Sequence, residues 1–251
     1  MNEEQFENSM GFVRECAKVA NVHGGLFVMA SDTDGIISYL DSNGLSKIYR
    51  NFVTDNVLHS PEDGDIHYNV YIPESYDGSC PYALYFMLPG YEGLYFQGVA
   101  GNLQSEEFGF EAQKYNGEMI VVAPQLGDCG ETMSIVVGKR PDLFTAYLYV
   151  SSKWDGEYEP VADSRLPVYF AIGRNDEYYG SGPTAEAYNR LHALYEERGL
   201  SETEIDALLV LDIKEHDYFT RRNMSNEHGG GGLFAYDENI MGWLFSKIKE
   251  L

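Results

Sequence analysis

The sequence has few basic residues and a large excess of acidic ones. Its 251 residues include 17 Lys and Arg against 40 Asp and Glu, so the formal net charge at pH 7 is −23. A surface with this charge repels the phosphate backbone of DNA and RNA, so we expect no nucleic-acid partner. The same charge favours solubility and by itself indicates no activity.

Cysteine is also scarce, and its spacing excludes two classes of site. The three cysteines, Cys16, Cys80 and Cys129, lie far apart, and no Cys-x-x-Cys pair occurs. This pattern indicates neither a zinc site nor a disulfide framework. No phosphate loop is present, and no Gly-x-Gly-x-x-Gly opens a helix after the first strand, which argues against a nucleotide-binding domain. We therefore expect no cofactor and no metal.

Long apolar runs are missing as well. No run approaches the ~20 residues that a membrane-spanning helix needs, so we expect no membrane association. The first ten residues, MNEEQFENSM, are acidic and lack the basic start and apolar run of a signal peptide. For the chain as it stands we expect a cytoplasmic protein; a leader missing from the N-terminus would instead make it secreted.

What the sequence does contain is an alternation of apolar strands and amphipathic helices from residue 67 onward. Continuous apolar runs are typical of buried parallel strands, and strands that alternate with helices predict an α/β domain with a mostly parallel sheet covered on both faces. The expected strands are 67–73, 82–88, 119–124, 145–151, 166–172 and 206–213, and the expected helices are 102–115, 131–141, 183–199 and 237–251.

The first 65 residues have a different pattern. Residues 4–20 carry apolar side chains at helical spacing, and residues 26–40 read as a strand, an Asp-Gly turn and a second strand. The sequence therefore predicts an N-terminal extension at 1–65, made of a helix and a β-hairpin, before an α/β domain at 66–251.

Polar residues that follow the predicted strands are the first candidates for a site, because sites in open α/β sheets form at the carboxyl ends of the strands. The strand at 82–88 is followed by PGYEG, where the backbone around Gly90 and the N–H of Tyr91 could form an oxyanion hole. The strand at 166–172 is followed by GRNDEYYG, where Asp176 could orient a histidine. Two histidines, His216 and His228, follow the last strand; we favour His228, in the glycine-rich NEHGGGG, as the base and keep His216 as the alternative.

A nucleophile is harder to find. The stretch VVAPQLGDCGETMS, residues 121–134, joins a strand to a helix start, and Cys129 lies at the corner. A thiolate at a helix N-terminus has a lowered pKa and is a good nucleophile. Against this role, Glu131 takes the place of a glycine, and Asp128 would raise the pKa of the thiol.

These segments together resemble α/β-hydrolase-fold esterases, in the group of feruloyl esterases, polyhydroxybutyrate-depolymerase-like enzymes and prolyl-oligopeptidase-like esterases. The resemblance rests on YNVYIPESYDGSCPYALYFMLPGYEG, VVAPQ, GKRPDLFTAYLYVSSKWDG, AIGRNDEYYG and AYDENIMGWLFS, and it runs from about Tyr68 to the C-terminus. It implies a carboxylic-ester hydrolase with an acyl-enzyme mechanism, acting on small esters or acylated sugars.

The chain departs from this family at the nucleophile. The family has a helix, a further strand and Gly-x-Ser-x-Gly between VVAPQ and a helix such as ETMSIVVGKRPDLF, whereas this chain joins the two directly. We therefore expect an α/β-hydrolase-like sheet that is one central strand short. Members of this family have Gly-Glu-Thr both after the strand that VVAPQ resembles and after the nucleophile. An in-frame loss between those two copies would produce GDCGET. Three outcomes stay open: an esterase, a non-catalytic or truncated relative, and a Cys129-dependent hydrolase of dienelactone-hydrolase type.

Overall fold

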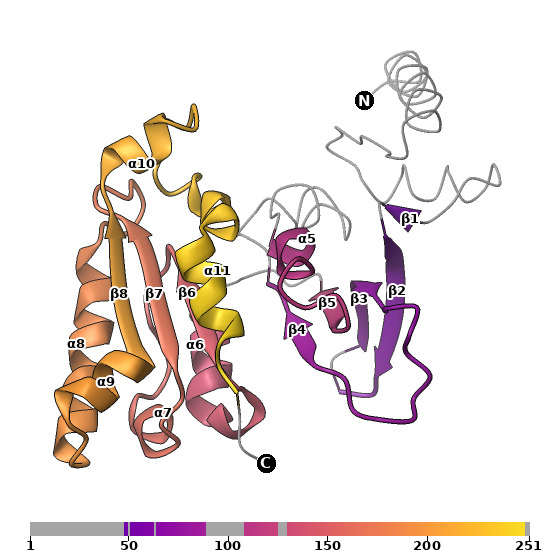
Figure 1. Ribbon diagram of the computed structural model, residues 1–251, viewed down its shortest axis with the longest axis horizontal. Helices are drawn as coiled ribbons and strands as arrows, with labels where there is room; N and C mark the ends of the chain where they lie inside the picture. The colour runs from indigo at the N-terminus through magenta and orange to yellow at the C-terminus, as the bar shows by residue number, and fades with distance from the viewer. Residues whose placement is uncertain (1–47, 50, 63, 89–107, 125–129, 249–251) are drawn as a thin grey trace. The chain divides into compact units, whose positions relative to one another are not determined.

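The computed structural model describes residues 48–49, 51–62, 64–88, 108–124 and 130–248 (Figure 1). The chain divides into two compact units, one formed by Met1–Ser105 and Glu118–Gly127, and the other by Glu106–Gly117 and Asp128–Leu251. Each unit has a sheet of its own. Most of the predicted N-terminal extension, including its helix and hairpin, lies outside the described residues.

The first unit contains a five-stranded sheet in the order β1-β2-β3-β5-β4. Its strands are β1 (Ile48–Tyr49), β2 (Phe52–Ser60), β3 (Gly64–Tyr71), β4 (Leu84–Phe86) and β5 (Ile120–Pro124). The pairs β1–β2, β2–β3 and β3–β5 are antiparallel, and only β4–β5 is parallel. A hairpin explains the antiparallel pairing of β2 with β3, because the short connection between Ser60 and Gly64 leaves no room for a parallel crossover.

The second unit contains a three-stranded sheet in the order β6-β7-β8, and both of its strand pairs are parallel. The strands are β6 (Tyr147–Val150), β7 (Val168–Gly173) and β8 (Leu209–Lys214). All six residues of β7 are buried. A parallel strand buried on both faces needs a helical layer on each side of the sheet.

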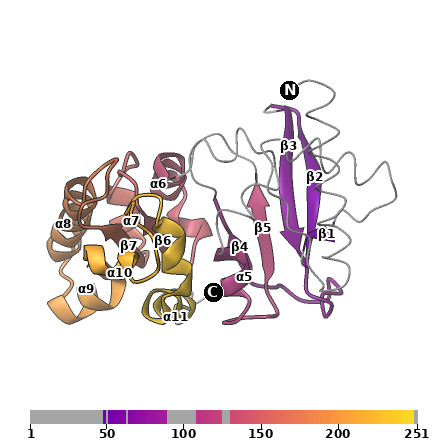
Figure 2. The ribbon, with the colours of Figure 1, turned by 90° about the horizontal axis from the view of Figure 1, so that it is seen from above.

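Neighbouring residues of β7 contact those two layers. Phe170 packs against Tyr188 of α8 (Gly182–Glu197), with ring centroids 6.3 Å apart. Tyr169 points to the other face and packs against Trp243 of α11 (Glu238–Phe245), at 5.2 Å. Figure 2 shows α8 and α11 on opposite sides of this sheet. The predicted α/β class, with helices on both faces of a parallel sheet, is confirmed in this unit.

The other helices of the second unit are short. They are α5 (Phe108–Ala112), α6 (Gly130–Lys139), the 3-10 turn η1 (Pro141–Leu143), α7 (Glu159–Asp163), α9 (Glu202–Leu208), α10 (His216–Thr220) and the 3-10 segment η2 (Gly231–Tyr236). Asp237 caps the last helix, because its side chain accepts a hydrogen bond from the N–H of Asn239 at 3.0 Å.

The last predicted strand begins too early in the sequence. Residues 206–208 were expected to begin a strand, but they end helix α9, and β8 starts at Leu209. The reason is a capping box, in which the backbone N–H of Ser201 donates to the Glu204 side chain and the serine side chain caps the helix in return. A capped helix start satisfies backbone groups that would otherwise lack partners, so the helix extends into the apolar run.

The connection between β5 and α6 consists of residues 125–129 only. A parallel crossover needs a dozen or more residues, so no additional helix and strand fit between these two elements. In the described part of the chain, β4 ends one sheet and β6 ends the other, and no strand pairs with their outer edges. That a hydrolase-like sheet is here one central strand short stays a prediction.

The predicted domain boundary at residue 65 falls inside β3, which pairs with β2 from the predicted extension. The division into 1–65 and 66–251 stays a prediction. None of the helices described for this chain is long and apolar enough to cross a membrane.

Gly156 gives a test of the packing between α6 and the loop after β6. A Cβ on Gly156 would lie 2.0 Å from the carbonyl oxygen of Ser134, a backbone atom of α6 that cannot move aside alone. We expect Gly156→Ala to lower the free energy of unfolding by about 3 kcal/mol. Gly182→Ala is the matched control, because a Cβ there meets nothing within 4 Å. Equal denaturant midpoints for the two variants would contradict this packing.

Candidate functional site

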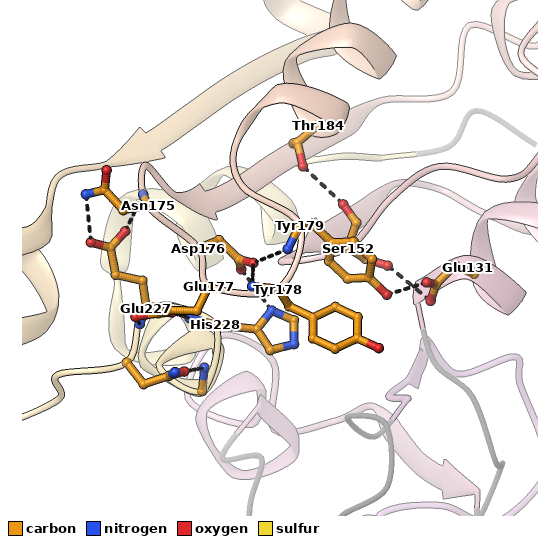
Figure 3. Close-up of polar contacts among 12 residues, drawn as sticks. Glu131, Ser152, Asn175, Asp176, Glu177, Tyr178, Tyr179, Thr184, Glu227 and His228 are labelled. Atoms are coloured by element: carbon orange, nitrogen blue, oxygen red, sulfur yellow. Dashed lines mark hydrogen bonds and ion pairs between the residues drawn. The ribbon is translucent and has the colours of Figure 1, made fainter.

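Asp176 lies in the turn that follows β7, and its side chain is fully buried. Its Oδ1 accepts hydrogen bonds from the backbone N–H groups of Tyr178, at 3.0 Å, and Tyr179, at 2.8 Å. Its Oδ2 lies 2.9 Å from Nδ1 of His228 (Figure 3). The carboxylate is therefore held by its own turn and faces the imidazole with its second oxygen.

His228 lies in the segment before η2 and is the only one of the two candidate histidines to contact Asp176. Its ring stacks on that of Tyr178, with centroids 5.3 Å apart, and meets Tyr179 nearly edge-on at 5.7 Å. Its side chain is 35% exposed, so one side of the imidazole remains accessible. The pair predicted from the order of the strands, Asp176 with His228, is thus brought together.

Asp176 and His228 each shift the pKa of the other toward its charged form. The hydrogen bond to Asp176 raises the pKa of His228 above its ordinary value, against the opposing effect of burial. The negative charges of Asp176, Glu177 and Glu131 add to that increase. Burial would raise the pKa of Asp176, but hydrogen bonds from His228, Tyr179 and Tyr178, together with the charge of His228, lower it. Each shift favours the charged form of its own side chain.

His216 has a different partner. Its Nδ1 lies 2.9 Å from Oε1 of Glu227, a carboxylate that is 1% exposed. The alternative assignment, with His216 in place of His228, would therefore join it to Glu227 and not to Asp176. Glu227 was missed by the sequence analysis, although it directly precedes His228.

Glu131, in the first turn of α6, connects to the same site. The Tyr179 hydroxyl donates a hydrogen bond to Oε1 of Glu131, and the Ser152 hydroxyl donates to Oε2 at 3.4 Å. Thr184 of α8 in turn donates to the carbonyl of Ser152 at 3.1 Å. The network links α6, the end of β6 and the start of α8 around the imidazole (Figure 3).

The remaining predicted site residues cannot be placed. Cys129, Gly90 and Tyr91 lie outside the described residues, so the cysteine and the oxyanion hole stay predictions. Ser151, at the end of β6, has a left-handed backbone with φ 44°, and its buried Oγ has no partner in the part of the chain described. At 8% exposure this hydroxyl has little access to a substrate.

One cluster of side chains has the residue types that could hold a metal ion. Among the described residues, His192, Glu196 and Glu202 are the only such cluster, on the surface of α8 and the start of α9. The two imidazole nitrogens face different carboxylates, Nδ1 toward Glu196 at 3.7 Å and Nε2 toward Glu202 at 3.2 Å. Each nitrogen thus has its own carboxylate partner, and we assign no metal to this cluster.

Comparison with known proteins supports the fold. No protein-family model and no curated protein matches the sequence. Among solved structures, the chain is similar to a thermostable esterase, with a TM-score of 0.57 and 14% identity over 79% of this chain. The chain has the α/β-hydrolase fold. It spans 64% of the esterase's length.

More distant likenesses are to two further hydrolases. Oligopeptidase B from Leishmania major has a TM-score of 0.46 and 12% identity, over 79% of this chain and 37% of its own. A feruloyl esterase module from Clostridium thermocellum, complexed with sinapinate, has a TM-score of 0.44 and 13% identity, over 80% of this chain and 89% of its own. These two likenesses are too weak to carry an argument about the site.

The ion pair makes a prediction about stability and pH. The raised pKa of His228 stabilises the fold at pH values below about 6.5, and the lowered pKa of Asp176 does so above about 3.8, so their joint effect is largest between those values. We expect Asp176→Asn to lower the free energy of unfolding by about 1 kcal/mol more at pH 5.5 than at pH 8.5. This value is smaller than that of a fully buried charged hydrogen bond, because His228 is partly exposed.

The measurement is chemical unfolding of wild type and variant at both pH values. Asp163→Asn is the matched control, because Asp163 pairs with Arg198 at 2.6 Å and arginine does not titrate in this range. A difference between wild type and Asp176→Asn that stays constant with pH would contradict the assignment.

Proposed function

We propose that this chain is a carboxylic-ester hydrolase in which His228 is the general base and Asp176 orients it. The observation that supports this most is the 2.9 Å contact between Nδ1 of His228 and the buried Asp176 carboxylate. With Nδ1 facing Asp176, the other ring nitrogen, Nε2, would accept a proton from a nucleophile and return it to the leaving alcohol.

The proposed nucleophile is Cys129, in the short connection between β5 and α6. Attack of its sulfur on the ester carbonyl would form a thioester and release the alcohol, with His228 transferring the proton. Water, deprotonated by the same imidazole, would then release the acid. Gly90 and Tyr91 are the proposed oxyanion donors, and no cofactor or metal takes part in the scheme.

The proposed substrates are small aromatic esters or acylated sugars. Tyr178 supports this choice, because its ring stacks beside His228 and the residue is 67% exposed. An exposed aromatic ring next to the base can stack on an aromatic acyl group or on the apolar face of a sugar. The net charge of −23 argues against nucleic acid as a substrate.

A second candidate function is binding without catalysis. It is favoured by the absence of Gly-x-Ser-x-Gly in the sequence and by the five-residue connection at 125–129, which leaves no room for the strand that normally presents a serine. In that case the Asp176–His228 pair would contribute to the stability of the site and to ligand binding, with no bond broken.

Turnover of p-nitrophenyl acetate by the purified protein distinguishes these functions. We expect His228→Ala to lower kcat/KM at least about 100-fold, the usual contribution of a general base. Cys129→Ala should abolish the burst of nitrophenol that accompanies thioester formation. His192→Ala is the control, because His192 lies on the surface between two exposed glutamates. Hydrolysis that is unchanged by His228→Ala, or a folded wild type without turnover, would reject the esterase and favour the binding function.

A further inference from the structure

The two loops that carry Asp176 and His228 are joined by more than that one ion pair. One loop follows β7 and contributes the consecutive residues Asn175, Asp176 and Glu177. The other precedes η2 and contributes Glu227 and His228. Asn175 contacts Glu227, Asp176 contacts His228, and Glu177 contacts both residues of the second loop (Figure 3).

Glu227 supplies the buried half of this arrangement. Its Oε2 accepts a hydrogen bond from the backbone N–H of Asn175 at 2.7 Å, and its Oε1 accepts from Nδ2 of the same residue at 3.2 Å. At 1% exposure the carboxylate depends on such donors, because a buried charge without partners is strongly unfavourable. A Cβ on Gly173 would lie 2.6 Å from Oε2 of Glu227, so this glycine makes the room for the carboxylate.

Glu177 supplies the exposed half, in the opposite direction. Its Oε1 accepts from the backbone N–H of Glu227 at 3.1 Å, and its Oε2 accepts from the N–H of His228 at 3.0 Å. A carboxylate from the loop before η2 thus accepts a hydrogen bond from the backbone of the loop after β7. A carboxylate from the loop after β7 accepts hydrogen bonds from the backbone of the loop before η2. The N–H of His228 belongs to the residue whose imidazole must meet Asp176.

We propose that Glu227 and Glu177 form a reciprocal clamp that positions His228 against Asp176, with Glu227 as the main positioning residue. An effect of this clamp on catalysis rests on the proposed function, whereas its effect on the position of the His228 ring does not. The hydrogen bond between His228 and Asp176 joins side chains on separate loops, so it keeps its length only while the two loop backbones keep their positions relative to each other. The clamp holds the two loops together through the backbone N–H groups of Asn175, Glu227 and His228.

The test is the proton NMR signal of the Nδ1–H of His228, which is shifted far downfield and protected from exchange when it donates to a carboxylate. We expect wild type to show this signal at pH 5.5. Glu227→Gln replaces one of the two accepting oxygens by an NH2 group, which cannot accept a hydrogen bond from Asn175. Glu227→Asp keeps the charge but shortens the side chain by one methylene. In both variants the signal should disappear, or the Nδ1 proton of His228 should exchange with water at least about 10-fold faster.

The charge-keeping variant separates positioning from electrostatics. If Glu227 acted only through its charge, Glu227→Asp would keep the signal, and the clamp would be rejected. Glu215→Gln is the matched control: Glu215 pairs with Arg174 beside the same loop, at 2.7 Å, and should leave the signal unchanged. If either Glu227 variant fails to fold, the exposed Glu177→Gln decides, and an unaltered signal there would also overturn the proposal.

The outcome is independent of ester turnover. Loss of the signal supports the clamp even in a protein without activity, whereas its absence in wild type rejects the clamp together with the Asp176–His228 hydrogen bond. If the wild type hydrolyses p-nitrophenyl acetate, Glu227→Asp should lower kcat about 10- to 100-fold with little change in KM, because misplacing a base affects the chemical step more than binding.

Discussion

The complete burial of strand β7 is the constraint on which the second unit depends. All six of its residues are inside, so both faces of the sheet must be covered. Phe170 meets α8 on one face, and Tyr169 meets α11 on the other. Because β7 is packed on both faces up to Gly173, the turn that follows begins from a well-packed residue. Asp176 lies only three residues further along, which is why its carboxylate can be held so closely.

The electrostatic environment of His228 has two opposite consequences for chemistry. Asp176, Glu177 and Glu131 all favour the imidazolium, so the neutral ring is a stronger base than an isolated histidine but is less populated at low pH. The same acidic groups disfavour any anion that forms beside them. An ester hydrolase built on this pair would have to develop its oxyanion on the side away from Glu131, where backbone N–H groups could stabilise it.

The sequence predicted the strands and helices whose patterns are long and unambiguous, such as β7 and α8. It also predicted the pairing of Asp176 with His228, because the order of strands in an α/β sheet brings their carboxyl ends to one edge. It failed at residues 206–208, where an apolar run suits a helix as well as a strand and the capping box decides. Glu227 and Glu177 could not be identified, because they act on backbone N–H groups whose directions a residue pattern does not reveal.

Retention of the Asp176–His228 pair and loss of a central strand are physically compatible. The second unit has its own core, in which Tyr149 of β6, Phe170 of β7 and Leu191 of α8 are completely buried. Both loops of the pair leave elements of this unit, and every contact of the clamp lies within it. A short connection at 125–129, without a nucleophile-bearing strand, is therefore compatible with an undisturbed contact between Asp176 and His228. The contact between Asp176 and His228 therefore depends on the packing of the second unit, and its presence does not by itself imply that a nucleophile is present.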